Sequence, residues 1–327
     1  MHLHKPPTAP VRARRLHVLR VIALAGCLAA TGLARPVPPT STAPAASEVI
    51  EFAVPPDFTP GPLEGVAGGK GLASPWEVQN KARGGYTVST QPEMAYRGLL
   101  LPPGVISGGD AYQSAGRHLD LSALPGLSRT ADHNGGEVTF LGKSATTVYL
   151  AVLLQKSEDS DQALFVCLHG AGVPWLTDEQ VVSVGFFGLP SQHDGRRVWS
   201  LLTRQEGQKP VVQPTTAPVE PGKPALLVLA IHFPPEPPSA STTTPVPVAR
   251  IELFVNPAVL GAGVPARPDV STTLPADALR VHTVAIYLGD APLQGSLAAL
   301  RIGPSFASVT PTADRPAADR PAPATEP

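Results

Sequence analysis

Cysteine is almost absent from this sequence, which has only Cys27 and Cys167 in 327 residues. Cys27 lies in an N-terminal segment with the features of an export signal, so the remaining chain holds one thiol and cannot form an intramolecular disulfide. Stability must then come from a hydrophobic core. Because Cys167 lies in the apolar run 165–168, we expect a buried, unreactive thiol rather than a nucleophile.

Basic residues are scarce beyond the N-terminus. The chain has 25 basic and 26 acidic residues, and five of the basic ones but none of the acidic ones fall in residues 1–34. Loss of that segment leaves 20 basic against 26 acidic residues, a net charge of −6. Nucleic-acid binding depends on neutralising phosphates, so a mildly acidic chain without a basic stripe is not expected to bind nucleic acid.

Apolar runs of membrane length are missing too. The run 21–30 is too short to span a bilayer, and no other stretch approaches the ~20 residues required. The run 21–30 comes after residues 1–20, which carry the five basic residues. The small residues Gly32 and Ala34 come after the run. This order is typical of a secretory signal peptide, here residues 1–34. We therefore expect an exported protein, whether periplasmic, displayed on the cell surface or secreted.

A second cleavage site lies inside the same run. Leu24-Ala25-Gly26-Cys27 resembles the lipobox of bacterial lipoproteins. The resemblance implies a signal of residues 1–26, cleavage before Cys27 and acylation of its thiol. Membrane contact is then expected only through this lipid anchor, and both cleavage sites remain open.

Proline, in contrast, is abundant, with 40 residues or more than twice the usual share of about 5%. Residues 35–48 form a Pro/Thr/Ala-rich linker and residues 312–327 a Pro/Ala-rich tail. Both lack large apolar residues, so we expect them to be disordered. The Pro/Thr-rich stretches 208–224 and 234–247 are bracketed by strand-like sequence and indicate long loops of one domain.

Between linker and tail the pattern is that of β-strands. In 250–256, apolar and polar residues alternate with a period of two, as in a half-buried strand. Apolar residues at the three-to-four-residue spacing of an amphipathic helix hardly occur. About ten to fourteen short strands predict an all-β, two-sheet sandwich over residues 49–311. The expected strands, each rich in β-branched, leucine or aromatic residues, are 137–141, 147–154, 163–169, 181–189, 226–233, 250–255 and 280–288.

Three motifs together resemble the laminin-G-like (LamG-like) domain of the concanavalin A-like lectin/glucanase superfamily, of the kind found in exported planctomycete-like bacterial proteins. They are a glycine-rich opening in 63–76 that ends in Trp76, a strand running into Asn256-Pro257, and a closing strand with a Thr-Pro stop in 300–311. The resemblance implies an antiparallel jelly roll. The family's acidic pair is replaced by Ala298-Ala299. We expect the glycines to serve turns or close backbone approach, Trp76 to pack on the sandwich, and Asn256 to form a turn.

Sets of catalytic residues are incomplete. His169-Gly170 resembles the oxyanion loop of α/β-hydrolases, but the nearest candidate for a nucleophile elbow, 303–307, has no histidine after it. A turn with a surface histidine is the expected structure at His169. The glucanase carboxylate run E-x-D-x-x-E does not occur, and 158–161 indicates a solvated turn. No catalytic residue is therefore assigned.

Metal ligands are not clustered, because the histidines occur singly. The loop groups 132–134 and His193-Asp194 could supply oxygen ligands to calcium, although plain turns are favoured. No other cofactor is expected.

Aromatic residues make up only 5% of the chain. Sugar sites use exposed aromatic rings, and Trp175, in an apparent loop, is the best candidate for one, with packing as the alternative. The sequence thus favours an exported, non-catalytic module that binds a glycan or an extracellular protein. A polysaccharide-degrading enzyme of the same superfamily, or a structural envelope protein without a small ligand, remains the alternative. The oligomeric state is not predicted.

Overall fold

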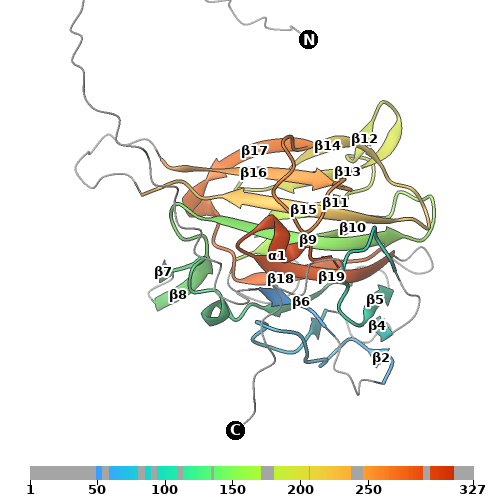
Figure 1. Cartoon of the computed structure of the whole chain (residues 1–327), viewed down its shortest axis with the longest axis horizontal. Coiled ribbons are helices and arrows are strands. Elements are labelled where there is room, and N and C mark those ends of the chain that lie inside the picture. The colour runs from blue at the N-terminus through green and yellow to red at the C-terminus, as the bar shows by residue number, and fades with distance from the viewer. Residues whose placement is uncertain are drawn as a thin grey trace, which may run out of the picture. The chain divides into compact units, whose positions relative to one another are not determined.

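The computed structural model describes residues 49–53, 59–79, 85–89, 94–108, 113–133, 136–170, 180–205, 207–236, 246–289 and 295–312. Strands are the main regular structure of these residues, and they form two large antiparallel sheets packed face to face (Figure 1). The predicted all-β sandwich is therefore confirmed.

The first sheet has nine strands, and all its pairs are antiparallel. Its order is β17 (Val270–Pro275), β16 (Val248–Val255), β15 (Pro224–His232), β9 (Thr147–Lys156), β19 (Gly295–Gly303), β5 (Val105–Gly108), β4 (Tyr86–Ser89) and β2 (Gly61–Pro62), with β1 (Ile50–Glu51) paired to β19.

The second sheet has eight strands, again antiparallel. Its order is β12 (Gln192–His193), β13 (Arg196–Thr203), β11 (Gln180–Phe186), β10 (Leu164–His169), β18 (Thr283–Tyr287), β6 (Ala115–His118) and β3 (Glu77–Val78), with β14 (Val211–Pro218) paired to β13. A separate hairpin joins β7 (Ser128–His133) to β8 (Gly136–Leu141), and the short helices are η2 (Leu121–Ala123), η3 (Ala276–Ala278) and α1 (Phe306–Val309).

The main core lies between the two sheets and is formed by every second side chain of the strands that face each other. Val148, Leu150 and Val152 of β9 belong to one buried cluster with Val166 and Leu168 of β10. Residues of a strand point to alternate faces, so the intervening residues of β9 face the other way.

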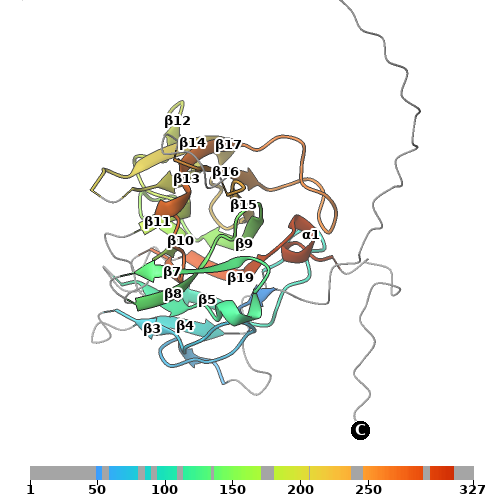
Figure 2. The ribbon, with the colours of Figure 1, turned by 90° about the vertical axis from the view of Figure 1, so that its left-hand side faces the viewer.

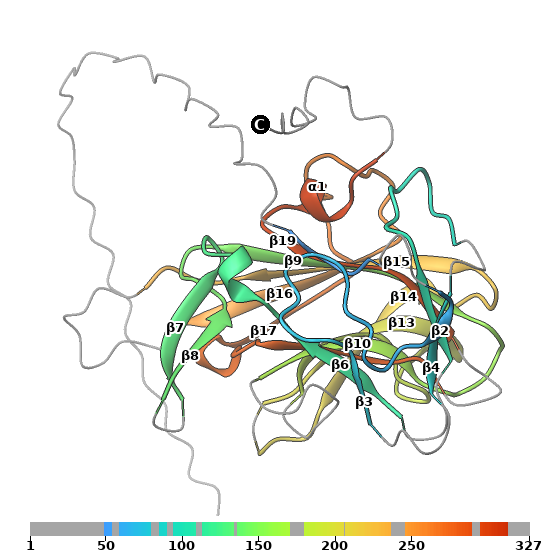
Figure 3. The same cartoon turned by 90° about the horizontal axis from the view of Figure 1, so that it is seen from below.

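A second buried cluster covers that other face of the first sheet. Tyr149 and Leu153 of β9 lie in it together with Phe254, Phe306 and Val309. The Tyr149 and Phe254 rings meet the Phe306 ring edge-on at 6.3 and 6.1 Å. Figures 2 and 3 show α1 on the side of β9 and β19 that faces away from the second sheet. Burial on both faces explains why 147–154 is almost uniformly apolar.

The expectation of a long loop at 208–224 is wrong, because this stretch contains β14. Among the described strands, β14 pairs only with β13, with Pro214 opposite Ser200 and Pro218 opposite Val198. Alternate N–H groups of an edge strand point away from the sheet, so proline is tolerated at these positions. The described residues hold 19 strands, more than the number expected, and four of them have only two residues.

The glycine-rich opening is shaped by backbone contacts, as expected. Gly69 has φ +86°, and a Cβ there would lie 2.2 Å from the Glu51 carbonyl oxygen. Trp76 is fully buried, with its ring 5.8 Å from that of Phe52, which confirms the expected packing. Arg117 donates to the Gly68 carbonyl at 2.8 Å and to that of Ser74.

The turn predicted at Asn256 is confirmed, whereas the closing strand predicted in 300–311 is only partly correct. Asn256 has φ +51°, and its Oδ1 accepts from the Leu226 N–H at 3.0 Å, so the predicted turn is confirmed. The closing strand ends at Gly303, and α1 follows where an extended stretch was expected, with the Ser305 Oγ capping it by accepting from the Ser308 N–H at 3.1 Å. No helix in the described part of the chain has the length and apolar character needed to cross a membrane.

The first and last strands of the described chain, β1 and β19, pair with each other. Ile50 pairs with Ile302, and the Arg301 Nε donates to the Glu51 carboxylate at 2.5 Å. At the other end of β19, Gly295 pairs with Lys156. With a rise of about 3.4 Å per residue, the β9–β10 turn lies about 24 Å along the strand from the point where the chain enters.

Candidate functional site

Three aromatic side chains gather on the outer face of the second sheet. Leu164 and Val166 of β10 point into the core, so Phe165 between them points outward. Phe165 stands opposite Tyr287 of β18, and their rings stack at 5.5 Å with an angle of 28°. The Phe187 ring lies 5.0 Å from that of Phe165 on the other side. We call Phe165, Phe187 and Tyr287 the aromatic surface.

A glycine gives this cluster its spacing. Gly185 of β11 stands opposite Phe165 and has φ +153°. A Cβ at Gly185 would lie 2.2 Å from the Leu164 carbonyl oxygen and 2.5 Å from the Phe165 Cβ. The glycine thus allows β11 to approach β10 closely and leaves no side chain between the rings of Phe165 and Phe187.

The aromatic surface is partly open to solvent, since all three rings have intermediate exposure. Leu189, two residues after Phe187, is 67% exposed. Aromatic rings combine a large apolar area with low conformational entropy, so partly exposed rings on rigid strands suit ligand contact.

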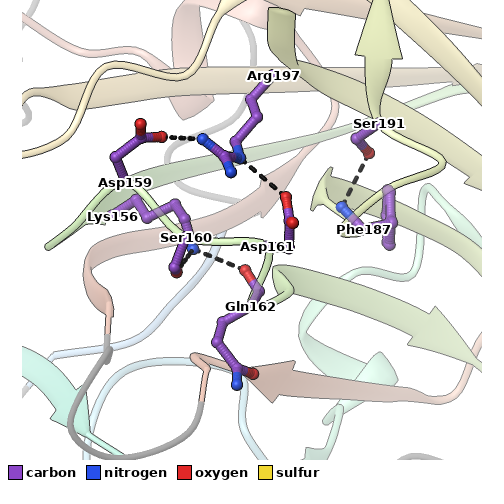
Figure 4. Close-up of polar contacts among 8 residues, drawn as sticks. All are labelled: Lys156, Asp159, Ser160, Asp161, Gln162, Phe187, Ser191 and Arg197. Atoms are coloured by element: carbon purple, nitrogen blue, oxygen red, sulfur yellow. Dashed lines mark hydrogen bonds and ion pairs between the residues drawn. The ribbon is translucent and has the colours of Figure 1, made fainter. Parts of the chain in front are cut away.

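The adjoining β9–β10 turn is held from within by Lys156, as Figure 4 shows. Lys156 is 1% exposed, and its Nζ donates to the Ser160 Oγ at 2.9 Å and to the Gln162 carbonyl at 2.7 Å. The Nζ also lies 5.1 Å from the centre of the Phe186 ring. Burial and, secondly, the charge of Arg197 lower the pKa of Lys156 to about 8.

The same turn is tied to β13 by Arg197 (Figure 4). Its Nε donates to the Asp161 carboxylate at 2.9 Å, and its Nη1 pairs with Asp159. On the neighbouring turn, the buried Ser191 accepts the Phe187 N–H with its Oγ at 2.8 Å. These contacts fix the backbone on either side of the aromatic surface.

Several solved structures match this chain at low TM-scores and low sequence identity. The receptor binding domain of botulinum neurotoxin D has a TM-score of 0.34 and 8% identity, over 71% of this chain and 45% of that one. The corresponding domain of the C/D mosaic serotype, with tetraethylene glycol and sulfate bound, has a TM-score of 0.36 and 6% identity, over 76% of this chain and 47% of that one. The binding domain of neurotoxin DC in complex with rat synaptotagmin II has a TM-score of 0.35 and 7% identity, over 71% and 44%.

This chain therefore spans less than half the length of the structures it matches. No protein-family model matches the sequence. No curated protein matches it either.

The two site residues assigned from the sequence, Trp175 and Cys27, lie outside the described residues. The segment 158–161 is a turn between strands, as expected, with its aspartates paired to Arg197. His193 and Asp194 also lie at a turn, in which Asp194 and Gly195 have φ +50° and +73°. These are the signs of a type I′ hairpin, so the plain turn is confirmed.

The calcium hypothesis gains no support from the described residues, in which no group of three or more His, Cys, Asp or Glu side chains has a metal-binding arrangement. Asp132 and His133 are the last residues of β7, and Asn134 is not described.

The expectation of a surface histidine at His169 is wrong. This residue ends β10, is 1% exposed and stands opposite Thr283 of β18. The outer face of the second sheet is buried at this end, so the local turn pattern was misleading. Cys167 is fully buried, and burial raises the pKa of its thiol to about 12, as expected for an unreactive cysteine.

A hydroxyl, an imidazole and a carboxylate also line up on the first sheet. Thr147 Oγ1 lies 3.0 Å from His232 Nδ1, and His232 Nε2 lies 2.8 Å from Glu252 Oε2. Arg250 pairs with the other Glu252 oxygen at 3.2 Å. Each residue belongs to a neighbouring strand, so the row is best explained as cross-strand stabilisation of β9, β15 and β16.

Sequence reasoning missed the aromatic surface. The alternation in 164–168 places Phe165 opposite to the core residues, and 284–287 does the same for Tyr287. That signal identifies outward rings, but their meeting depends on the pairing of β10 with β18, which no local pattern encodes.

Proposed function

We propose that this protein is an exported, non-catalytic module that binds a glycan on the aromatic surface. The observation that supports this most is the close grouping of three partly exposed rings, with centroids 5.0 and 5.5 Å apart, on adjacent strands. Phe165 lies between the other two rings, so the exposed ring edges and the outer sides of Phe187 and Tyr287 would contact the apolar face of a pyranose sugar, and nearby polar groups would orient it.

Polar groups lie beside the rings. The turn that carries Asp159 and Asp161 touches the turn after Phe187, because a Cβ at Gly188 would be 2.9 Å from the Asp161 carbonyl oxygen. The Asp159–Arg197–Asp161 group can therefore offer hydrogen bonds to sugar hydroxyls at the border of the aromatic surface.

The described chain enters the sandwich far from the aromatic surface. Ile50 pairs at the Ile302 end of β19, whereas the turns beside the aromatic surface lie at its Gly295 end. If Cys27 is acylated, residues 28–48 would link the lipid anchor to the binding module. Cleavage after Ala34 would instead release the same module.

A protein partner is the second candidate, and the 67% exposure of Leu189 favours it. Exposed leucine next to aromatic rings is typical of protein contacts. An enzymatic role has less support, because the adjacent carboxylates of Asp159 and Asp161 are both paired with Arg197.

A glycan-array screen of the purified chain tests the proposal, with and without calcium. We expect binding that is weakened about fivefold to tenfold in Phe165→Ala and Tyr287→Ala and unchanged in Val211→Ala, which alters an exposed residue on edge strand β14. Binding of native strength in both aromatic variants would contradict the glycan proposal. Leu189→Ser separates the candidates, since it should weaken a protein partner far more than a sugar.

A further inference from the structure

A pocket of about 370 Å³ lies away from the aromatic surface. It is formed by residues next to η2, by the β7–β8 hairpin and by His282, which precedes β18. Tyr287 ends the same strand, so the pocket and the aromatic surface are about 17 Å apart along β18. Figure 3 shows the hairpin at the left edge of the molecule. The polar lining residues are Asp120, Ser122, Ser128, Thr130, Thr139 and His282.

Asp120 is the one charged residue in this lining. Its Oδ1 accepts from the Ser122 N–H at 3.1 Å and from the Ser122 Oγ at 2.5 Å, which fixes the carboxylate. Within the described residues no donor reaches the other carboxylate oxygen. Thr130 Oγ1 and Thr139 Oγ1 lie 3.2 Å apart and add further acceptors.

The His282 side chain carries no positive charge that would repel a bound cation in this pocket. Burial and, secondly, the neighbouring His118 lower the pKa of His282, so its ring is neutral at pH 7. The two rings lie 5.2 Å apart. The His282 Nδ1 is buried and has no hydrogen-bond partner in the described part of the chain. A buried polar atom without a partner costs free energy, and a bound N–H donor that reached it would remove that cost.

We propose that this pocket binds a small polar molecule through its primary ammonium group. A fixed carboxylate, several hydroxyl acceptors and a neutral imidazole, with no lysine or arginine in the lining, complement a cation that carries N–H donors. The volume lies at the small end of ligand pockets and suits one sugar ring or one amino-acid side chain. An amino sugar and a lysine side chain both supply this chemistry.

Calorimetric titration of the purified full chain at pH 7 tests the proposal with two matched pairs of probes. Glucosamine is compared with N-acetylglucosamine, and Nα-acetyl-lysine amide with its Nε-acetylated form. We expect at least one amine to bind about tenfold more tightly than its acetylated partner, as one charge-assisted hydrogen bond allows. The amine that binds identifies the source of the ammonium group.

Asp120→Asn supplies the matched variant, because asparagine keeps an oxygen that accepts from Ser122. It should abolish the preference for the amine, whereas Asp194→Asn, in an exposed turn, should leave it unchanged. Equal binding of amine and acetylated probe, no binding of either amine, or a preference that survives in Asp120→Asn would overturn the proposal. If Asp120→Asn does not fold, the probe pairs on the native chain decide alone.

Discussion

The buried ammonium group of Lys156 should make the stability of this protein depend on pH, and methionine at this position should remove that dependence. The folded protein lowers the pKa of Lys156 from 10.5 to about 8, chiefly by burial. The unfolded chain therefore binds the proton more tightly, and between pH 8 and 10.5 it holds more protons than the folded state. The free energy of unfolding must rise with pH in this window.

The size of the effect follows from the shift. Below pH 8, keeping Lys156 charged in the folded state costs about 3 kcal/mol, and this cost disappears by pH 10.5. Lys156→Met fills a similar volume beside Phe186 but gives up the hydrogen bonds to Ser160 and Gln162, each worth about 1 kcal/mol. Near pH 7 the variant should therefore differ little from the native chain. Toward pH 10.5 the native chain should gain about 3 kcal/mol over the variant.

Urea denaturation followed by tryptophan fluorescence, at one-unit steps from pH 7.5 to 10.5, measures this difference. Groups that titrate in the same way in both chains cancel in the comparison. Lys223→Met is the control, because that lysine is exposed and should give a stability curve parallel to the native one. Parallel curves for Lys156→Met as well would refute the burial argument.

Three further predictions concern the framework. Gly185→Ala places a methyl group 2.2 Å from the Leu164 carbonyl oxygen and should cost about 3 kcal/mol in urea denaturation, whereas Gly85→Ala, with no neighbour within 4 Å, should cost under about 1 kcal/mol. Arg301→Met leaves the Glu51 carboxylate and the Leu100 carbonyl without their donor and should cost about 3 kcal/mol by thermal denaturation, against under about 1 kcal/mol for Lys223→Met, where both the lysine and its partner Glu220 are exposed. In a Cys27→Ser chain, Cys167 should react with a thiol reagent at pH 8 no faster than the protein unfolds, and rapid labelling of the native state would show that the thiol is accessible.

Local alternation made much of the fold predictable from the sequence. In 250–255 the apolar residues 251, 253 and 255 are all buried in the main core. β14 escaped prediction because proline at 214 and 218 was given more weight than the possibility of an edge position. Whether a strand lies at the edge or in the centre of a sheet depends on which strands pair with it. Strand pairing is not encoded in the local sequence.

The candidate site was less accessible to sequence reasoning. Trp175 was favoured by its residue type, and it lies outside the described residues. Phe165 and Tyr287 are far apart in sequence and meet only through the register of β10 and β18, while Gly185 brings β11 close enough for Phe187 to join them. A phenylalanine in an apolar strand is usually a core residue, so composition alone pointed away from it.

The most direct test of glycan binding on the aromatic surface is an intermolecular nuclear Overhauser experiment with the best glycan from the array. We expect contacts from the ring protons of Phe165 and Tyr287 to the axial C–H protons of one sugar face, and loss of the Tyr287 contacts in Tyr287→Ala, whose circular dichroism should show the native β fold. Each stacked ring contributes about 1 kcal/mol, so the same variant should weaken binding about fivefold to tenfold. Sugar contacts that appear only on other residues, with affinity unchanged in Tyr287→Ala, would contradict the assignment.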